Sequence, residues 1–295
     1  MAKIGIVTIL YNSAKVLSDF LSSLDKQDYK EFCLFAIDNK SPDNSLDILN
    51  RLKGTLTYEI VIVENHKNYG VAKANNIGIE KALAMGCDLV LLANNDIVLK
   101  RDTIRNLIDS HYKNGAMISV PKIFYYKTEN INSAGGEFCY YSGNFKMNAK
   151  GRKDSHKYAI SRWVDYAPTC FMLINPIVFH EIGNMDERFF VYFDDTDFCY
   201  RAYKKGFKIL FEPSSIVEHK ESTCTGGNMS DFFIYYFYRN LVFFARKHFD
   251  SMQKLVVYKY HILKFLFRDI YYYGYYKKII LIYRAIKEGL SIPLY

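Results

Sequence analysis

Paired cysteines are absent from this chain of 295 residues. No Cys-x-x-Cys spacing occurs, and the six cysteines stand singly: Cys33, Cys87, Cys139, Cys170, Cys199 and Cys224. This spacing excludes a zinc site made of cysteine pairs, and it excludes a disulfide framework. Single free thiols are typical of a reducing compartment, so we expect a protein of the cytosol.

Long apolar runs are absent as well. No uninterrupted run reaches the roughly 20 residues that a membrane-spanning helix needs. The apolar run at the N-terminus is short, and Tyr11-Asn12-Ser13 follows it without a small-residue cleavage site. We therefore expect a first strand there rather than a signal peptide, and a cytoplasmic location.

Acidic residues are scarce only at the end of the chain. Residues 232–295 hold 11 Lys and Arg against 3 Asp and Glu, so this tail carries the whole net charge of +8. The tail also holds 20 of the 49 aromatic residues. Interleaved basic and aromatic side chains suit the surface of an anionic membrane. Helices that pack on the rest of the protein or on a second subunit are the alternative. No RNA or DNA motif is present, and we expect no nucleic-acid partner.

What is present in the first half is an alternation of short β-branched runs with amphipathic segments. We expect strands at 4–10, 32–37, 58–64 and 89–93, and helices at 13–24, 45–52 and 75–85. This alternation is typical of a parallel sheet covered by helices. Ligands of such sheets bind beyond the carboxyl ends of the strands, so the loops at 8–12, 38–44, 66–76 and 94–97 are expected to converge.

The pattern weakens after residue 120. We expect irregular strands and a loop over 121–162, a strand over 163–174, helices over 176–182 and 196–205, a strand over 208–211, and a helical tail. Gly206 ends the second of these helices. The expected division is a domain over 1–230, with halves 1–120 and 121–230, followed by the tail over 231–295.

Two acidic motifs stand out in this frame. Asp194-Asp195-Thr196-Asp197 lies between aromatic residues, and Asn94-Asn95-Asp96 follows an apolar strand. Carboxylates among apolar side chains need a cation, a proton or a hydrogen-bond donor to compensate them. A metal-bound diphosphate and a proton to be abstracted would provide this compensation.

Eight motifs in order resemble family-2 glycosyltransferases of the GT-A fold, nearest to a rhamnosyltransferase-like branch. They are Val7-Thr8 with Tyr11-Asn12-Ser13, Ile37 to Asp43, Asn68 to Ala72 with Asn75 to Ile79, Leu92 to Asp96, Ser133 to Gly136, Met185 to Phe190, the acidic cluster, and Glu218-His219-Lys220. The resemblance covers residues 3–245. It implies a Rossmann-like mixed sheet and a nucleotide-sugar-dependent transferase.

The resemblance implies a divalent cation, Mg²⁺ or Mn²⁺, at Asp96 with His219. The cation would lie against the donor's diphosphate, where carboxylate and phosphate oxygens suit a hard ion. Asn94 stands where relatives carry the first acid of an Asp-x-Asp motif. For His219, a structural role is the alternative.

The resemblance also implies that Asp195 is the general base that deprotonates an acceptor hydroxyl. Asp194 is its supporting neighbour, in a place where relatives usually carry Glu. We expect Asp197 to cap the helix that begins there.

The donor's nucleotide, UDP or dTDP, is expected to contact seven residues by the same resemblance: Thr8, Tyr11, Asp38, Asn39, Lys73, Asn94 and Asn95. For Asp38, a turn-forming role is equally compatible with the sequence. Lys73 is either a phosphate contact or solvated. Arg188, Tyr166 and Thr169 are expected to face the acceptor.

The reaction implied is inverting transfer of a sugar to a hydroxyl of a glycan, in the synthesis of a bacterial-type cell-surface polysaccharide. The acceptor is expected to be lipid-linked, and the enzyme to lie on the inner face of the cell membrane through its tail, which is also a possible homo-oligomer contact. A nucleotide-sugar-binding scaffold protein is one alternative. A sugar-nucleotide pyrophosphorylase is another, but the glycine-rich phosphate loop of those enzymes is missing from residues 8–13.

Overall fold

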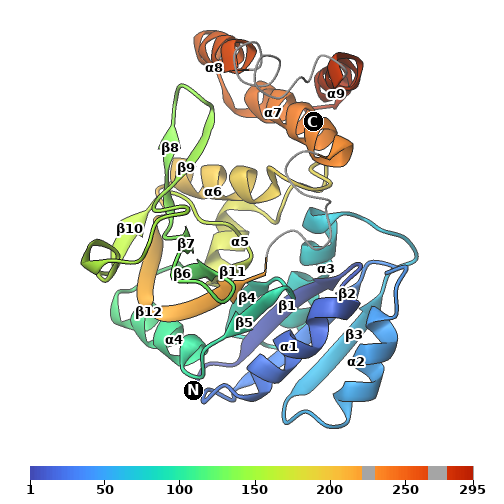
Figure 1. Ribbon diagram of the computed structural model, residues 1–295, viewed down its shortest axis with the longest axis vertical. Helices are drawn as coiled ribbons and strands as arrows, with labels where there is room; N and C mark the ends of the chain where they lie inside the picture. The colour runs from blue at the N-terminus through green and yellow to red at the C-terminus, as the bar shows by residue number, and fades with distance from the viewer. Residues whose placement is uncertain (221–229, 265–277, 295) are drawn as a thin grey trace.

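A mixed sheet forms the centre of the computed structural model, which describes residues 1–220, 230–264 and 278–294 (Figure 1). The strand order is β10-β12-β6-β11-β4-β1-β2-β3, with β5 paired to β12 and β7 to β6. The strands of this sheet are β1 Ile4–Leu10, β2 Phe32–Asp38, β3 Glu59–Glu64, β4 Leu89–Ala93, β5 Ile97–Leu99, β6 Ile118–Tyr125, β7 Ile131–Ser133, β10 Arg162–Val164, β11 Phe171–Ile174 and β12 Ile209–His219. A separate hairpin consists of β8 Gly136–Cys139 and β9 Asn144–Met147.

Helices cover both faces of the sheet and extend from one end of it (Figure 1). They are α1 Ala14–Asp25, α2 Ser45–Lys53, α3 Val71–Ala84, α4 Thr103–Lys113, α5 Pro176–Ile182, α6 Asp194–Lys205, α7 Asp231–His248, α8 Ser251–Lys264 and α9 Ile279–Ser291, with a short 3₁₀ helix at His156–Tyr158. Side chains of α1, α2 and α4 belong to the core on one face. Those of α3, α5 and α6 belong to the core on the other face.

The sequence pattern explains the parallel half of the sheet. Strands β1 to β4 are parallel to one another, although β4 also pairs antiparallel with β11, and all but β3 at the edge are almost wholly buried. Successive residues of a strand point to opposite faces, so Ile6 joins the core under α1 while Val7 joins the core under α3. Both faces must be apolar, which is why these strands read as continuous hydrophobic runs.

The second half departs from the expected elements. The strand expected over residues 163–174 is wrong: β10 and β11 are separate strands, on the edge and in the middle of the sheet, and Pro168 lies in the loop between them. The strand expected to end at 211 continues to His219, with a register shift between Glu212 and Ile216. Elements β5, α4 and β6 follow the Asn94-Asn95-Asp96 motif and were not predicted.

Helix boundaries also differ. Helix α6 begins at Asp194 instead of residue 196, and α3 begins at Val71 instead of residue 75. Both start directly after a residue with positive φ, Phe193 in one case and Gly70 in the other. Such starts leave no N-cap pattern in the sequence, because the usual Ser, Thr, Asp or Asn cap is missing.

The C-terminal helices pack on the site-bearing part of the molecule through an aromatic core of their own. This core joins Phe189, Phe193 and Tyr200 to Phe243 and Phe244 of α7. Helix α9 lies against α7 at Gly289, where a Cβ would collide with the Arg239 carbonyl. In the described parts of the chain, no helix combines the length and apolar character needed to cross a membrane. The division of the chain at residues 120 and 230 stays a prediction.

Candidate active site

The carboxyl ends of β1, β2 and β4 meet at one edge of the sheet. Leu10 pairs with Asp38 across β1 and β2, and its carbonyl accepts a hydrogen bond from the Asn39 amide at 2.9 Å. The side chain of Asn95, after β4, donates to the Ile9 carbonyl at 2.6 Å. The expected convergence of these loops is confirmed by the pairing.

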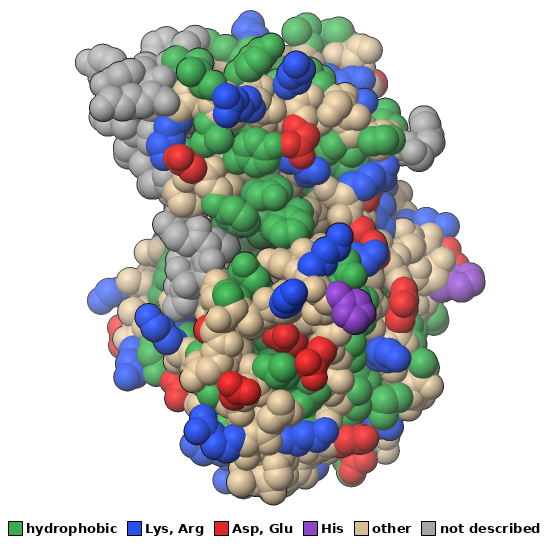
Figure 2. Space-filling view, turned by 90° about the vertical axis from the view of Figure 1, so that its right-hand side faces the viewer, with side chains coloured by type: hydrophobic (Ala, Val, Ile, Leu, Met, Phe, Trp, Pro, Cys, Tyr) green, Lys and Arg blue, Asp and Glu red, His purple; other side chains and the backbone are tan. Residues whose placement is uncertain are grey.

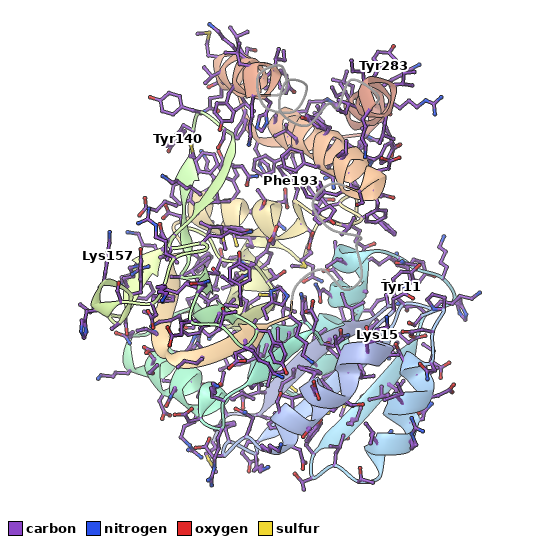
Figure 3. The ribbon with its side chains drawn as sticks, in the orientation of Figure 1. Tyr11, Lys15, Tyr140, Lys157, Phe193 and Tyr283 are labelled. Carbon is purple, nitrogen blue, oxygen red and sulfur yellow. The ribbon has the colours of Figure 1, made fainter. Side chains whose placement is uncertain are left out.

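Three of the expected nucleotide contacts lie at this edge: Thr8, Tyr11 and Asp38. Thr8 and Asp38 are buried, and the Thr8 hydroxyl has no hydrogen-bond partner among the described residues. Burial raises the pKa of Asp38, against a hydrogen bond from the Ser41 amide. Tyr11 is half-buried at the end of β1 (Figure 3). A buried acceptor beside an unused hydroxyl is suited to a base with N–H and C=O groups.

Asn39 has a different role from the expected one. Its amide nitrogen donates to Asn68 Oδ1 at 3.0 Å and to the Gly70 carbonyl at 3.1 Å. Its amide oxygen accepts from Asn65 Nδ2 at 3.0 Å and from the Tyr69 amide at 3.2 Å. The four bonds use the full capacity of an amide, so Asn39 organises the loop over 65–70 rather than offering groups to a ligand.

Lys73 is tied to an acid. Its ammonium lies 3.1 Å from Glu187 Oε2 and 5.2 Å from the centre of the Tyr69 ring. The hydrogen bond to Glu187 raises the pKa of Lys73. Both side chains of the pair are exposed, so a phosphate group has access to the lysine only in competition with Glu187.

Asp96 and His219 come together although 123 residues separate them. Antiparallel pairing of β5 with β12 sets His219 opposite Ile97, next to Asp96. His219 Nε2 lies 3.1 Å from Asp96 Oδ1. Asn94, two residues before Asp96, is exposed, and its amide donates to the Cys170 carbonyl at 2.8 Å.

These two side chains fit part of a cation site. A carboxylate and an imidazole suit Mn²⁺ or a similar ion that takes its remaining ligands from phosphate or water. No group of three or more His, Cys, Asp or Glu residues suited to a metal occurs within residues 1–220, 230–264 and 278–294. The Nδ1 atom of His219 is buried and unpaired there, whereas metal-bound imidazoles usually donate from this second nitrogen. Of the described residues, these two would supply ligands to such an ion, and the donor's diphosphate would supply others.

Asp195 is held by two donors in the first turn of α6. Tyr166 donates its hydroxyl proton to Asp195 Oδ2 at 2.7 Å, and the Thr196 amide donates to Oδ1 at 2.6 Å. The Tyr166 ring is buried and stacks on Phe145 with ring centres 4.5 Å apart. Tyr166 therefore orients Asp195. It does not face outward, although an acceptor contact was expected of it.

Burial raises the pKa of Asp195, and the hydrogen bonds from Tyr166 and Thr196 only partly oppose this. Burial and the adjacent charge of Asp195 also raise the pKa of Asp194. A raised pKa makes a carboxylate a stronger proton acceptor as long as the pKa stays below the working pH. The side chain of Asp195 keeps partial exposure.

Cys170 lies directly before β11 and is buried. Burial, followed by the charges of Asp96 and Asp195, raises the pKa of its thiol. The charges of both carboxylates act on this one thiol, and the Asn94 backbone amide donates to the Cys170 carbonyl at 2.8 Å, which is consistent with one site at the end of β4 and the start of α6. The thiol is protonated at neutral pH and is part of the core.

Asp197 is not a helix cap, contrary to expectation. It is fully buried and accepts from Arg201 Nε at 2.7 Å, Lys247 Nζ at 2.6 Å and His248 Nε2 at 2.7 Å. Burial alone would raise its pKa, but the hydrogen bond from His248 and the charges of Arg201 and Lys247 hold the pKa well below its usual range. Asp197 joins α6 to the end of α7.

Arg188 and Thr169 are the other two residues that were expected to face the acceptor. Arg188 makes a two-bonded pair with Asp186, at 2.8 and 2.6 Å, and donates to the Pro293 carbonyl at 2.7 Å. It therefore docks the C-terminal segment instead of facing an acceptor. Thr169 is half-buried in the loop before β11, next to Cys170.

Sequence reasoning missed the residues of α7 that reach the site. Asn240 donates to the carbonyls of Val191 and Tyr192, and Lys247 and His248 bind Asp197. Only the Asp197 and Arg201 pair, four residues apart on one helix, carried a local signal. The other contacts span about 50 residues and have no pattern.

Comparisons with known proteins identify the family of this chain. The family model described as glycosyl transferase family 2 matches residues 5–183. The chain is 25% identical over 220 residues to the low-salt glycan biosynthesis hexosyltransferase Agl10 of Haloferax volcanii, covering 67% of each chain. It is 43% identical over 74 residues to the poly(ribitol-phosphate) beta-glucosyltransferase of Bacillus spizizenii, covering 23% of this chain and 11% of that one.

Solved structures share the backbone arrangement. TarS 1-349 of S. aureus in complex with UDP-GlcNAc has a TM-score of 0.62 at 15% identity, over 98% of this chain and 81% of that one. GalNAc-T7 with UDP, GalNAc and Mn²⁺ has a TM-score of 0.66 at 15% identity, over 98% and 55%. A mannosyltransferase of Pyrobaculum calidifontis with GDP-Man and Mn²⁺ has a TM-score of 0.59 at 14% identity, over 99% and 76%. This likeness confirms the expected GT-A fold.

Proposed function

Because the chain belongs to glycosyl transferase family 2, we propose that it moves a hexose from a UDP- or dTDP-sugar to a hydroxyl of a glycan, with Asp195 as the general base. The single observation that carries this proposal is the partly buried Asp195, which the Tyr166 hydroxyl holds at 2.7 Å and whose charge, like that of Asp96, raises the pKa of the Cys170 thiol. The name of the Haloferax relative supports a hexose and a glycan. Membership of the rhamnosyltransferase-like branch stays a prediction.

In the proposed reaction, Asp195 takes the proton of the acceptor hydroxyl. The hydroxyl oxygen then forms a bond to the anomeric carbon while the bond from that carbon to the diphosphate oxygen breaks on the opposite face. An alcohol becomes a good nucleophile only as its proton leaves, so the base must be within hydrogen-bond reach. Attack from the opposite face inverts the anomeric centre. Tyr166 keeps the Asp195 carboxylate oriented, and Thr169 remains our candidate for an acceptor contact.

For the donor, we propose that Thr8, Tyr11 and Asp38 receive the base, and that Asn94 lies near the phosphates. Asn95 is better suited to joining β4 to β1 than to contacting the nucleotide, since its side-chain amide donates a hydrogen bond to the Ile9 carbonyl. Asp96 and His219 would hold Mn²⁺ or Mg²⁺, and the fold relatives with bound Mn²⁺ support this. Such an ion supplies positive charge that stabilises the leaving diphosphate.

We further propose that the enzyme works at a membrane surface on a lipid-linked acceptor. The outward side of α8 carries Met252, Leu255, Val256, Ile262 and Leu263, each between 41 and 70% exposed. Ile279, Ile280, Tyr283 and Leu290 are exposed on α9, where Arg284 and Lys287 are exposed beside them. Figure 2 shows mostly hydrophobic and basic side chains over the upper part of the molecule. Apolar residues flanked by cations suit an anionic bilayer.

A transfer assay tests the reaction. The purified full chain is incubated with a panel of UDP-, dTDP- and GDP-sugars and with lipid-linked glycan acceptors, in Mn²⁺ or in a chelator. We expect transfer from one UDP- or dTDP-sugar, inversion at the anomeric carbon by NMR, and loss of rate in the chelator. Nucleotide binding with no turnover on any of the acceptors would instead favour the scaffold alternative. The sequence lacks the phosphate loop of a pyrophosphorylase, and no observation of the structure favours that function.

A further inference from the structure

The chain enters α6 through two residues in the left-handed region. Tyr192 has φ 61° and Phe193 has φ 64°, directly before Asp194 and Asp195. Bulky side chains rarely adopt this conformation, and two in succession persist only when the surroundings impose them. The turn aims the start of α6, so whatever holds it also sets the direction of Asp195.

Asn240 of α7 contacts this turn. Its amide nitrogen donates to the Val191 carbonyl at 2.8 Å and to the Tyr192 carbonyl at 2.9 Å. The side chain is fully buried, and its oxygen accepts from Arg239 Nη1 at 2.6 Å. The two carbonyls flank the first left-handed residue, so the amide fixes the turn on both sides.

Aromatic side chains of α7 hold the same turn by packing. The Phe193 ring lies between α6 and α7 and contacts Phe237 and Phe244, at 5.6 and 5.7 Å between ring centres (Figure 3). Beyond the turn, Lys247 and His248 fix the first turn of α6 through Asp197. One helix from the C-terminal part of the chain thus holds the turn and the helix that follows it.

We propose that α7 positions the general base, with Asn240 as the positioning residue that imposes the left-handed turn before Asp195. This inference rests on the proposed function, because it assigns Asn240 a role through Asp195. Asn240 touches neither donor nor acceptor in this account. Its loss should therefore reduce turnover while the nucleotide still binds.

The experiment compares Asn240→Ala with a matched control on the same helix. Val242→Ala removes a buried side chain from the side of α7 that faces Gly289 of α9 and leaves the turn alone. We expect Asn240→Ala to lower kcat about 100-fold, the effect of misplacing a reacting group by about 1 Å, with the KM for the donor within two-fold of wild type. The control should keep kcat within three-fold. Equal kcat values for the two variants would overturn the proposal.

A second variant distinguishes positioning from simple loss of stability. Glycine adopts positive φ freely, so adding Tyr192→Gly to Asn240→Ala should restore kcat at least five-fold. If Asn240 were only structural, the double variant would be no better than the single one, since Tyr192→Gly also removes contacts with Phe232 and Phe233.

Hydrogen exchange provides a readout that does not depend on the reaction. Amides of residues 193–196 should exchange at least ten-fold faster in Asn240→Ala than in Val242→Ala. Equal exchange would overturn the positioning role itself. A third outcome combines two results: exchange is faster in Asn240→Ala, and Asp195→Asn transfers sugar at the normal rate. It would show that the turn is held as described and that the proposed function is wrong.

Discussion

At the scale of single residues, Asp195 owes its properties to its neighbours. Burial raises its pKa, and the Tyr166 hydroxyl at 2.7 Å limits that rise. The family resemblance placed Tyr166 near an acceptor. Its contact with Asp195 spans 29 residues and depends on how β10 and β11 separate, which no local pattern shows.

We predict that Tyr166→Phe shifts the acid limb of the pH profile. The lost hydrogen bond favoured the carboxylate, so the pKa of Asp195 should rise by about one unit, given a charged hydrogen bond of about 1.5 kcal/mol. As pH falls, the base is then protonated earlier, and kcat/KM should decline from a higher pH. Rates measured from pH 5 to 9 check this.

Tyr29→Phe is the control for this profile. It removes a tyrosine hydroxyl that bonds to the Ala2 carbonyl far from the site. An unshifted acid limb in Tyr166→Phe, or an equal shift in Tyr29→Phe, would contradict the assigned role of Tyr166.

At the scale of elements, Asp197 joins α6 to α7. Three cationic or imidazole side chains surround a carboxylate with no exposed surface. The sequence predicted α6 nearly correctly, from its apolar spacing and Gly206. It predicted the wrong role for Asp197 because an acid near a helix start usually caps, and the partners on α7 were out of reach of local rules.

We predict that Asp197→Asn lowers the free energy of unfolding by about 3–5 kcal/mol at pH 7, because it removes the fully buried carboxylate that pairs with the partly buried Arg201 and Lys247. The folded-state pKa of Asp197 lies below the unfolded value of about 3.9. Its contribution is therefore complete above that value and is lost as pH falls toward the folded-state pKa. The gap between wild type and variant should narrow below about pH 4.

Urea unfolding at several pH values measures this gap. Glu181→Gln, which removes an exposed acid paired with Lys205, is the control and should change stability little. A gap that is absent at pH 7, or that widens in acid, would show that Asp197 does not act as described.

At the scale of the whole molecule, the basic and aromatic tail separates into an inner helix and two outer ones. Helix α7 packs on α6 and on the turn before it, while α8 and α9 lie on either side of α7 at the far end of the molecule (Figure 1). The sequence offered membrane binding and internal packing as alternatives. The aromatic core around α7 is the internal packing. The exposed apolar residues of α8 and α9 support our proposal of membrane binding.

We predict that the full chain floats with vesicles of phosphatidylcholine and phosphatidylglycerol, and less so in high salt. Leu255→Asp with Ile280→Asp should reduce recovery at least five-fold, because both side chains are more than 60% exposed on the outer helices. Ile177→Asp, on exposed apolar surface of α5, is the matched control. Equal recovery would contradict the membrane proposal, and a dimer that the double variant dissolves would assign this face to a second subunit.

More of the fold than of the candidate site could be predicted from the sequence. Continuous apolar strands between amphipathic helices determine the parallel half, since each strand must be buried on both faces. The motifs predicted a role for Asp195 and a joint role for Asp96 and His219, whereas the contact between His219 and Asp96 depends on the pairing of β5 with β12. The sequence did not predict β5, and it did not predict that β12 continues beyond residue 211.

The transfer rate of Asp195→Asn tests the central claim most directly. The substitution keeps the shape of the side chain and removes its ability to take a proton, while Thr8, Asp38 and Asp96 remain in place. We predict that nucleotide affinity stays within two-fold and that kcat falls by at least about 100-fold, the usual contribution of a general base. Transfer at the wild-type rate by the folded variant would contradict the account.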